Sequence, residues 1–185
     1  MTINDLIGDG VEFFAEQRAR LERRGIDISG CPLSHLALRT ETDGEYLRLR
    51  DQIEKFCKAN IENVWNGRPI SKMLLSQPLN LGDGFAVPRI ELIPPPHRSL
   101  YKMGLEHTGV VIGESVDEFA ARHRSALSGQ QFQSEHCEPY YLTFDDHTNV
   151  KFYRYSLLDV VVMEGHRFDG FYHVDDRPGA SSAHS

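Results

Sequence analysis

Residues 32–39 read Pro-Leu-Ser-His-Leu-Ala-Leu-Arg, and residues 105–112 repeat the pattern as Leu-Glu-His-Thr-Gly-Val-Val-Ile. In each stretch a histidine, His35 or His107, begins a short apolar run that is typical of a buried strand. Side chains alternate between the two faces of a strand, so His35 shares its face with every second residue up to Arg39. The repeat therefore predicts a pseudo-symmetric protein with its site between two equivalent halves.

The predicted elements follow the same order on either side of a proline-rich segment. In the first half they are strand 33–39, helix 45–58 and strands 61–65, 70–75 and 87–93. In the second half they are strand 104–112, helix 115–127 and strands 131–134, 140–144 and 150–155. Further helical patterns cover residues 3–24 and 156–165, and a loop is expected at 77–84. The sequence therefore predicts an α+β fold of two βαβββ modules with extra N- and C-terminal helices.

These patterns divide a chain of 185 residues, which fits one structural domain, into five segments. They are an N-terminal helical extension (1–30), a first module (31–93), a proline-rich linker (94–102), a second module with a closing helix (103–165) and a tail (166–185). The end of the tail is rich in small and polar residues, which is typical of segments without a packed core.

The amino-acid composition indicates the cellular compartment and excludes some classes of binding partner. The net charge is −7, from 20 basic and 27 acidic residues, which argues against a broad surface for nucleic acid or anionic lipid. Three cysteines without a CxxC spacing favour free thiols in a reducing compartment. The acidic N-terminus has no apolar signal region, and the apolar run at 157–163 is far shorter than the ~20 residues that span a bilayer. We therefore expect a cytoplasmic protein without a nucleic-acid or membrane partner.

The two modules carry His35 and His107 on their first strands and Glu91 on the last strand of the first module. This arrangement resembles the vicinal oxygen chelate superfamily, which includes glyoxalase I, extradiol dioxygenases and fosfomycin-resistance proteins. The resemblance implies a half-open curled sheet of the glyoxalase/dihydroxybiphenyl dioxygenase type. It also implies inward-facing metal ligands on the first and fourth strands of each module, and the matching positions are His35, Glu91 and His107.

Within the superfamily the chain is most similar to the YecM-like branch, small bacterial proteins described as candidate metal binders. The segments that carry the similarity are residues 34–39, 66–70, 90–92, 106–107 and 150–152. Many superfamily members have a second carboxylate on the last strand, whereas this chain, like the YecM-like branch, has Lys151. Lysine at neutral pH donates hydrogen bonds and is a poor metal ligand. The implied site is therefore two histidines and one glutamate with open coordination positions.

Two histidines and a glutamate suit divalent Zn, Fe, Mn, Ni or Co and do not choose among them. Alternation along the strands adds substrate-binding candidates Arg39, Lys151 and Tyr153, and Arg68 follows from its place in the Asn-Gly turn. Such cations around a metal favour a small ligand that bears carboxylate or phosphate. Alternation also places Glu106 on the opposite face from His107, which predicts a solvated carboxylate.

Two classes of function remain open. One is a metal-binding protein whose ion polarises the oxygens of a small anionic oxo or hydroxy compound, with isomerase, lyase and dioxygenase chemistries all compatible. The other is a non-catalytic module that holds a small anion through Arg39, Arg68 and Lys151. A drug-sequestering protein would need a largely apolar groove, which these charged candidates disfavour. Superfamily members often dimerise or exchange modules, so the resemblance is also compatible with a homodimer.

Overall fold

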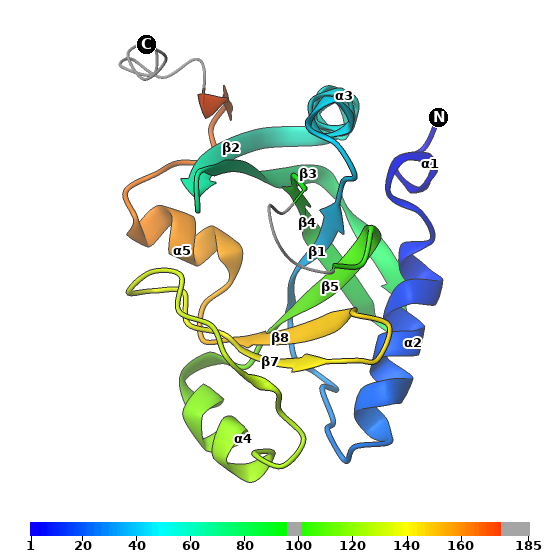
Figure 1. The fold of residues 1–185 in the computed structure, drawn as a ribbon, viewed down its shortest axis with the longest axis vertical. Helices are drawn as coiled ribbons and strands as arrows, with labels where there is room; N and C mark the ends of the chain where they lie inside the picture. Colours follow the sequence, from blue (N-terminus) through cyan, green and yellow to red (C-terminus); the bar gives the residue numbers. More distant parts are fainter. Residues whose placement is uncertain (96–100, 175–185) are drawn as a thin grey trace.

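A computed structural model describes residues 1–95 and 101–174 of the chain. The described residues form a curled, unclosed sheet of nine strands in the order β6-β7-β8-β5-β1-β4-β3-β2-β9 (Figure 1). The strands are β1 (Leu33–Arg39), β2 (Cys57–Trp65), β3 (Arg68–Gly82), β4 (Phe85–Ile93), β5 (Gly104–Val111), β6 (Gly129–Gln130), β7 (Tyr140–Thr143), β8 (Asn149–Tyr153) and β9 (Phe171–Tyr172).

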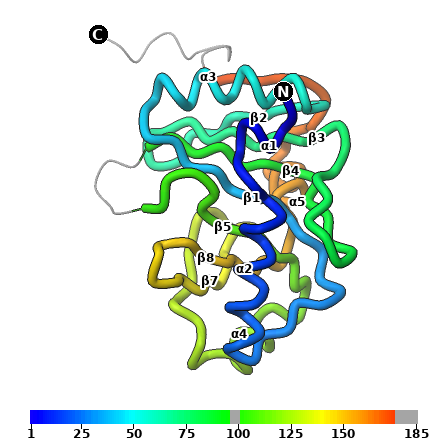
Figure 2. Tube along the Cα trace, turned by 90° about the vertical axis from the view of Figure 1, so that its right-hand side faces the viewer, coloured from blue at the N-terminus to red at the C-terminus, as the bar shows by residue number. Residues whose placement is uncertain are grey.

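Helices flank this sheet on both sides. They are α1 (Asn4–Ile7), α2 (Gly10–Glu22), α3 (Asp43–Ile53), α4 (Val116–Arg122) and α5 (Leu157–Met163), with 3-10 turns η1 (Glu54–Phe56) and η2 (Gly113–Ser115). Helix α2 crosses one face and contacts β3 and β5, whereas α5 lies on the other side of the sheet (Figure 1, Figure 2). Across the described ranges no helix has the length and apolar character needed to cross a bilayer.

The strand order confirms the predicted pair of βαβββ modules. In the first module β1 pairs in parallel with β4, and β3 and β2 follow outward; in the second, β5 pairs in parallel with β8, and β7 and β6 follow. The modules join through the antiparallel pair β1 and β5. The first and fourth strands of both modules therefore lie side by side in the middle of the sheet.

Alternation along the central strands separates an apolar core from a polar face. Leu36 of β1 and Ile90 of β4 point into the main core, where the apolar side of α2 also packs. Their neighbours His35 and Glu91 point to the opposite face, because successive side chains of a strand alternate. Every residue of β1 is buried. The apolar core therefore packs against the central strands on the side of the sheet opposite the polar face.

Three boundaries in the first half differ from the predicted elements. The helix expected at 45–58 ends with α3 at Ile53, and β2 already begins at Cys57. The N-terminal helix is interrupted at Gly8, which has a φ of 91°, and Asp9 then caps α2 by accepting a hydrogen bond from the backbone of Glu12. The loop expected at 77–84 instead continues β3 as far as Gly82, because this segment pairs with β4. Tertiary pairing here overrides a weak local pattern.

The second half and the C-terminal segment also differ. The helix expected at 115–127 is shorter and ends with α4 at Arg122, and the strand expected at 131–134 is replaced by the two-residue β6. Strand β9 lies in the predicted tail and pairs in parallel with β2. The predicted linker includes residues 96–100 and the predicted tail includes residues 175–185, all of which lie outside the described residues.

Replacing Ile90 by alanine tests whether the apolar core supports the central strands. Ile90 is 0% exposed, so we expect Ile90→Ala to lower the free energy of unfolding by about 2–5 kcal/mol through lost burial and an unfilled cavity. The matched control is Val64→Ala on β2, where the side chain is 56% exposed, and it should cost less than about 1 kcal/mol. Urea denaturation measures both. Equal losses would contradict the assigned core.

Candidate metal centre

His35 of β1, Glu91 of β4 and His107 of β5 converge on one point of the polar face. The Nε2 atoms of the two histidines lie 3.2 Å apart. Oε2 of Glu91 lies 3.5 Å from Nε2 of His35 and 3.3 Å from Nε2 of His107. Both histidines are 0% exposed and Glu91 is 8% exposed. Among the described residues, these three side chains form the group of histidine and acidic residues that lie close enough together to hold one metal ion.

Strand register explains why the three side chains meet. Ala37 of β1 pairs with Glu91 on one side and with His107 on the other. His35, two residues earlier on the same face, pairs with Gly109 of β5. A Cβ atom built on Gly109 would lie only 2.6 Å from Cε1 of His35. Glycine at this position therefore leaves the space that the His35 ring occupies.

The spacing of the three atoms fits a single metal ion. Nitrogen and oxygen ligands bind such ions at about 2.0–2.2 Å, so two ligands that meet at an angle between 90° and the tetrahedral value lie about 2.8–3.6 Å apart. The separations of 3.2, 3.3 and 3.5 Å fall within that range. Two imidazoles and a carboxylate are also a donor set that divalent transition metals accept.

Hydrogen bonds behind the rings fix their orientation. Nδ1 of His35 lies 2.9 Å from Oγ of Ser34, which also accepts a hydrogen bond from the backbone N–H of Leu157 in α5. Nδ1 of His107 lies 3.1 Å from Oε1 of Glu106. An ionised carboxylate only accepts hydrogen bonds, so Nδ1 of His107 donates and its Nε2 keeps a lone pair toward the centre.

The prediction that Glu106 is solvated is wrong. The register between β1 and β5 shifts between Ala37 and Leu38, which pair with His107 and Leu105, so Glu106 is the extra residue of a β-bulge. Glu106 is 2% exposed and forms an ion pair with Nε of Arg39. The bulge turns its carboxylate to the side of His107. Simple alternation assumes an unbroken ladder and therefore could not place this residue.

Burial and neighbouring charges set the protonation of the centre. Burial lowers the pKa of His35 to about 3, although the charge of Glu91 opposes this, so the ring is neutral at pH 7. Burial alone would raise the pKa of Glu91, but the adjacent imidazoles of His107 and His35 and the charge of Lys151 hold it below its usual range. The same balance, with Arg39 and His107 as partners, lowers the pKa of Glu106. A neutral imidazole and an ionised carboxylate are the forms that bind metals.

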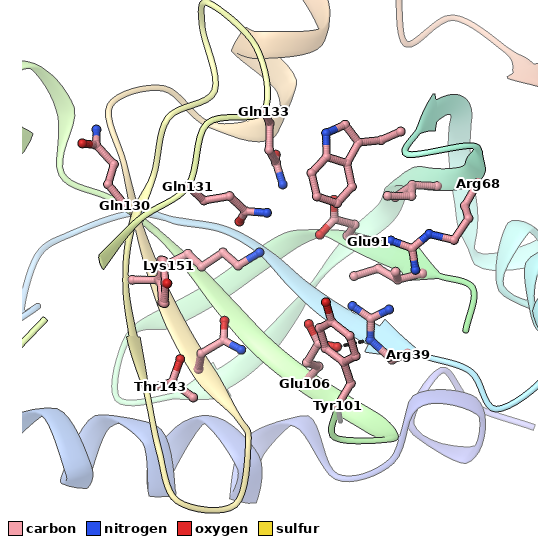
Figure 3. Close-up of a pocket in the computed structure, with 15 residues that line it drawn as sticks. Arg39, Arg68, Glu91, Tyr101, Glu106, Gln130, Gln131, Gln133, Thr143 and Lys151 are labelled. Carbon is pink, nitrogen blue, oxygen red and sulfur yellow. Dashed lines mark hydrogen bonds and ion pairs between the residues drawn. The ribbon is translucent and has the colours of Figure 1, made fainter. Parts of the chain in front are cut away.

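A cavity of about 320 Å³ opens onto Glu91 between the two modules (Figure 3). Three of the four predicted substrate-binding residues line it: Arg39, Arg68 and Lys151. Tyr153 does not, because it is 3% exposed and packs its ring edge-on against His35, with ring centroids 5.5 Å apart. Tyr153 therefore lies beside the histidine rather than in contact with the cavity.

The three cations differ in what they already bind. Arg39 is ion-paired with Glu106, donates a hydrogen bond to the carbonyl of Pro94 (3.1 Å) and lies over the ring of Tyr101. Arg68 donates a hydrogen bond to a backbone carbonyl at 3.3 Å. The Lys151 ammonium extends into the cavity and makes no hydrogen bond or ion pair with any described residue (Figure 3). Of the three, Lys151 is the most available to a ligand.

Sequence reasoning missed the uncharged residues of the site. Gln131 and Gln133 line the cavity from the segment that joins β6 to β7, and Trp65 and Asn149 line it from β2 and β8. The short strand β6 has too few residues to show a periodicity, so no signal located the glutamines. Asn149 shares its strand face with Lys151, so alternation along β8 could have found it.

Comparisons with known proteins agree with this architecture. Residues 2–152 match the family model described as YecM protein. Protein YecM of Escherichia coli (strain K12) is 24% identical, over 88% of this chain and 94% of that protein. A solved structure named Protein EC4020 has a TM-score of 0.67 and 25% identity, over 85% of this chain and 91% of that chain. A Mn(II)-bound fosfomycin resistance protein, FosX, from Listeria monocytogenes is 15% identical over 75% of this chain and 99% of that chain, with a TM-score of 0.29.

Replacing Gly109 by alanine tests the close approach of His35. The added Cβ would lie 2.6 Å from Cε1 of the His35 ring, so we expect Gly109→Ala to displace the ring and cost about 1–3 kcal/mol in the free energy of unfolding. Gly44→Ala in α3 is the matched control, because its Cβ would meet no atom closer than 4.0 Å, and it should be neutral or slightly stabilising. Thermal and urea denaturation measure both, and a Gly109→Ala protein as stable as the parent would contradict the contact.

The lowered pKa of His35 predicts that the metal-free protein is sensitive to acid. The unfolded state binds a proton near pH 6.5, whereas the folded state resists it down to about 3. Stability is therefore fully present above pH 6.5 and falls as the pH drops, by about 2 kcal/mol between pH 7.5 and 5 from this group. Urea denaturation in a chelator should show a flatter pH dependence for His35→Gln than for the parent. Identical slopes would contradict the buried neutral ring.

Proposed function

This chain belongs to the YecM protein family, and we propose that it is a metal-binding protein whose divalent ion is held by His35, Glu91 and His107. The observation that carries the proposal is the approach of three ligand atoms to within 3.2–3.5 Å of one another in a buried place. Lone pairs of two imidazoles and a carboxylate repel one another when they converge without a cation or a shared proton between them. A bound ion supplies that positive charge.

Membership of the vicinal oxygen chelate superfamily is part of the proposal. It is supported by the two βαβββ modules and by ligands that come from the first and fourth strands of the first module and the first strand of the second. The equivalent position on β8 is Lys151, which pairs with Gly109 in the parallel ladder. The protein would therefore supply three ligands and leave the remaining coordination positions open toward the cavity.

When bound, the ion would act as a Lewis acid that polarises the oxygens of a small ligand. The chain's own residues have separate tasks. Glu106 accepts the hydrogen bond from Nδ1 of His107 and so keeps Nε2 directed at the centre. Lys151 and Arg68 attract a ligand that carries negative charge. Zn, Fe, Mn, Ni and Co remain compatible with the donor set, and isomerase, lyase and dioxygenase chemistries remain compatible with the open positions.

One observation favours a rival function. The ammonium of Lys151 has no acidic partner among the described residues although it lies in a cavity with Arg68. That arrangement would also serve a non-catalytic module that holds a small anion without metal. The two proposals differ in whether the histidines carry an ion. Location in the cytoplasm and a homodimeric state stay predictions.

Metal content separates the two functions. The parent should hold about one ion per chain after incubation with Zn, Mn, Ni, Co or Fe(II) and desalting, and its unfolding temperature should rise with metal concentration. Glu91→Gln and His107→Gln should each lose at least ten-fold in affinity, since each removes one of three ligands. Elemental analysis by mass spectrometry and differential scanning calorimetry measure these effects.

His166→Gln is the matched control, because His166 is only partly buried and its side chain makes no hydrogen bond to a described residue. It should bind metal as the parent does. A parent protein without metal, and without a thermal shift for any of the five ions, would contradict the metal centre and leave the anion-binding module.

A further inference from the structure

One wall of the cavity carries hydrogen-bonding groups that the protein does not use. The side-chain amide of Gln131 makes no hydrogen bond to a described residue, and that of Gln133 accepts one from the thiol of Cys137 (3.0 Å). Figure 3 shows both glutamine side chains directed toward the middle of the cavity. An amide donates and accepts, so this wall matches hydroxyl groups, which do both as well.

The charges in the cavity favour one negative group on the ligand. Lys151 extends from β8 on one side and Arg68 from β3 on the other (Figure 3), and neither has an acidic partner among the described residues. The two acidic residues of the lining are already in contact with positive or hydrogen-bonding groups, Glu91 with the histidines and Glu106 with Arg39. The lining thus holds three cations (Arg39, Arg68 and Lys151) and two carboxylates, and the net positive charge favours a carboxylate on the ligand.

The remaining residues that line the cavity limit the size and shape of the ligand. Ile70, Ile93 and Trp65 form an apolar cluster that borders the cavity. An indole face packs against the carbon skeleton of a ligand and leaves its hydroxyl groups to the opposite wall. A volume of about 320 Å³ is at the small end of ligand sites. The site therefore suits one ring or a short chain of about six carbons.

We propose that the cavity binds a polyhydroxylated carboxylic acid of the sugar-acid class. Its carboxylate lies toward Lys151 and the metal centre, and its hydroxyl groups lie along Gln131 and Gln133. This assignment rests on the proposed metal site only for the orientation of the carboxylate. The amide wall and the free cations bind the same class of ligand whether or not an ion is present.

Selectivity follows from the unpaired amides. An acid with an alkyl chain would bury the amide of Gln131 and the NH₂ group of Gln133 without hydrogen-bonding partners, and sites built to pair polar groups reject ligands that lack them. A neutral sugar would pair the amides but would not neutralise the net positive charge of the cavity lining. Both analogues should therefore bind at least ten-fold more weakly than a sugar acid.

Isothermal titration of metal-loaded and of chelator-treated protein tests this with three probes: gluconate, hexanoate and glucose. Gluconate should bind at least ten-fold more tightly than either analogue in both samples.

Gln131→Leu and Gln133→Leu should each weaken the binding of gluconate at least five-fold and leave the binding of hexanoate unchanged or tighter. Lys151→Met should weaken both acids and leave glucose unaffected. Gln77→Leu on the exposed part of β3 is the matched control and should bind all three probes as the parent does.

These titrations test the sugar-acid proposal independently of the proposed metal site, because metal content is measured on the same samples before and after titration. Hexanoate that binds as tightly as gluconate, or gluconate that binds neither sample, would overturn the sugar-acid assignment even in a fully metal-loaded protein. Gluconate selectivity in a protein that never holds metal would support the assignment and contradict the metal centre.

Discussion

The antiparallel pairing of β1 with β5 is the contact on which the candidate site depends. It joins the two modules and sets Ala37 between Glu91 and His107, so that ligands from three strands meet at one point. It also brings His35 over Gly109, where no larger residue leaves room for the ring. The apolar core behind these strands holds the register, because a slip of one residue would move every side chain to the opposite face.

Hydrogen bonds then extend from the centre to the surrounding structure. Arg39 pairs with Glu106, Glu106 accepts from His107, and His107 approaches Glu91. On the other side Ser34 links the ring of His35 to the start of α5. These supports fix ring orientation in a site that excludes water, where a misplaced ligand atom would cost most. The cavity beyond Glu91 is, by contrast, lined by side chains that retain unused donors and acceptors.

The sequence was sufficient for the repeated βαβββ order, because apolar runs and turn signals recur in the same order in both halves. The set His35, Glu91 and His107 was implied by the family resemblance and not by periodicity. The fold as a curled sheet came from the family resemblance rather than from periodicity. Glu106 could not be placed, since a β-bulge breaks the alternation on which its prediction rested. Gln131 and Gln133 could not be found either, because the short β6 has no detectable pattern and only the folded chain brings it over the site.

The most direct test of the account is an anomalous diffraction map from crystals of the protein grown with Zn(II) or Mn(II), measured on either side of the metal absorption edge. The account predicts one peak per chain at about 2.0–2.2 Å from Nε2 of His35, Nε2 of His107 and a carboxylate oxygen of Glu91. A map without a peak at this point, in crystals where the three side chains keep their separations, would contradict it.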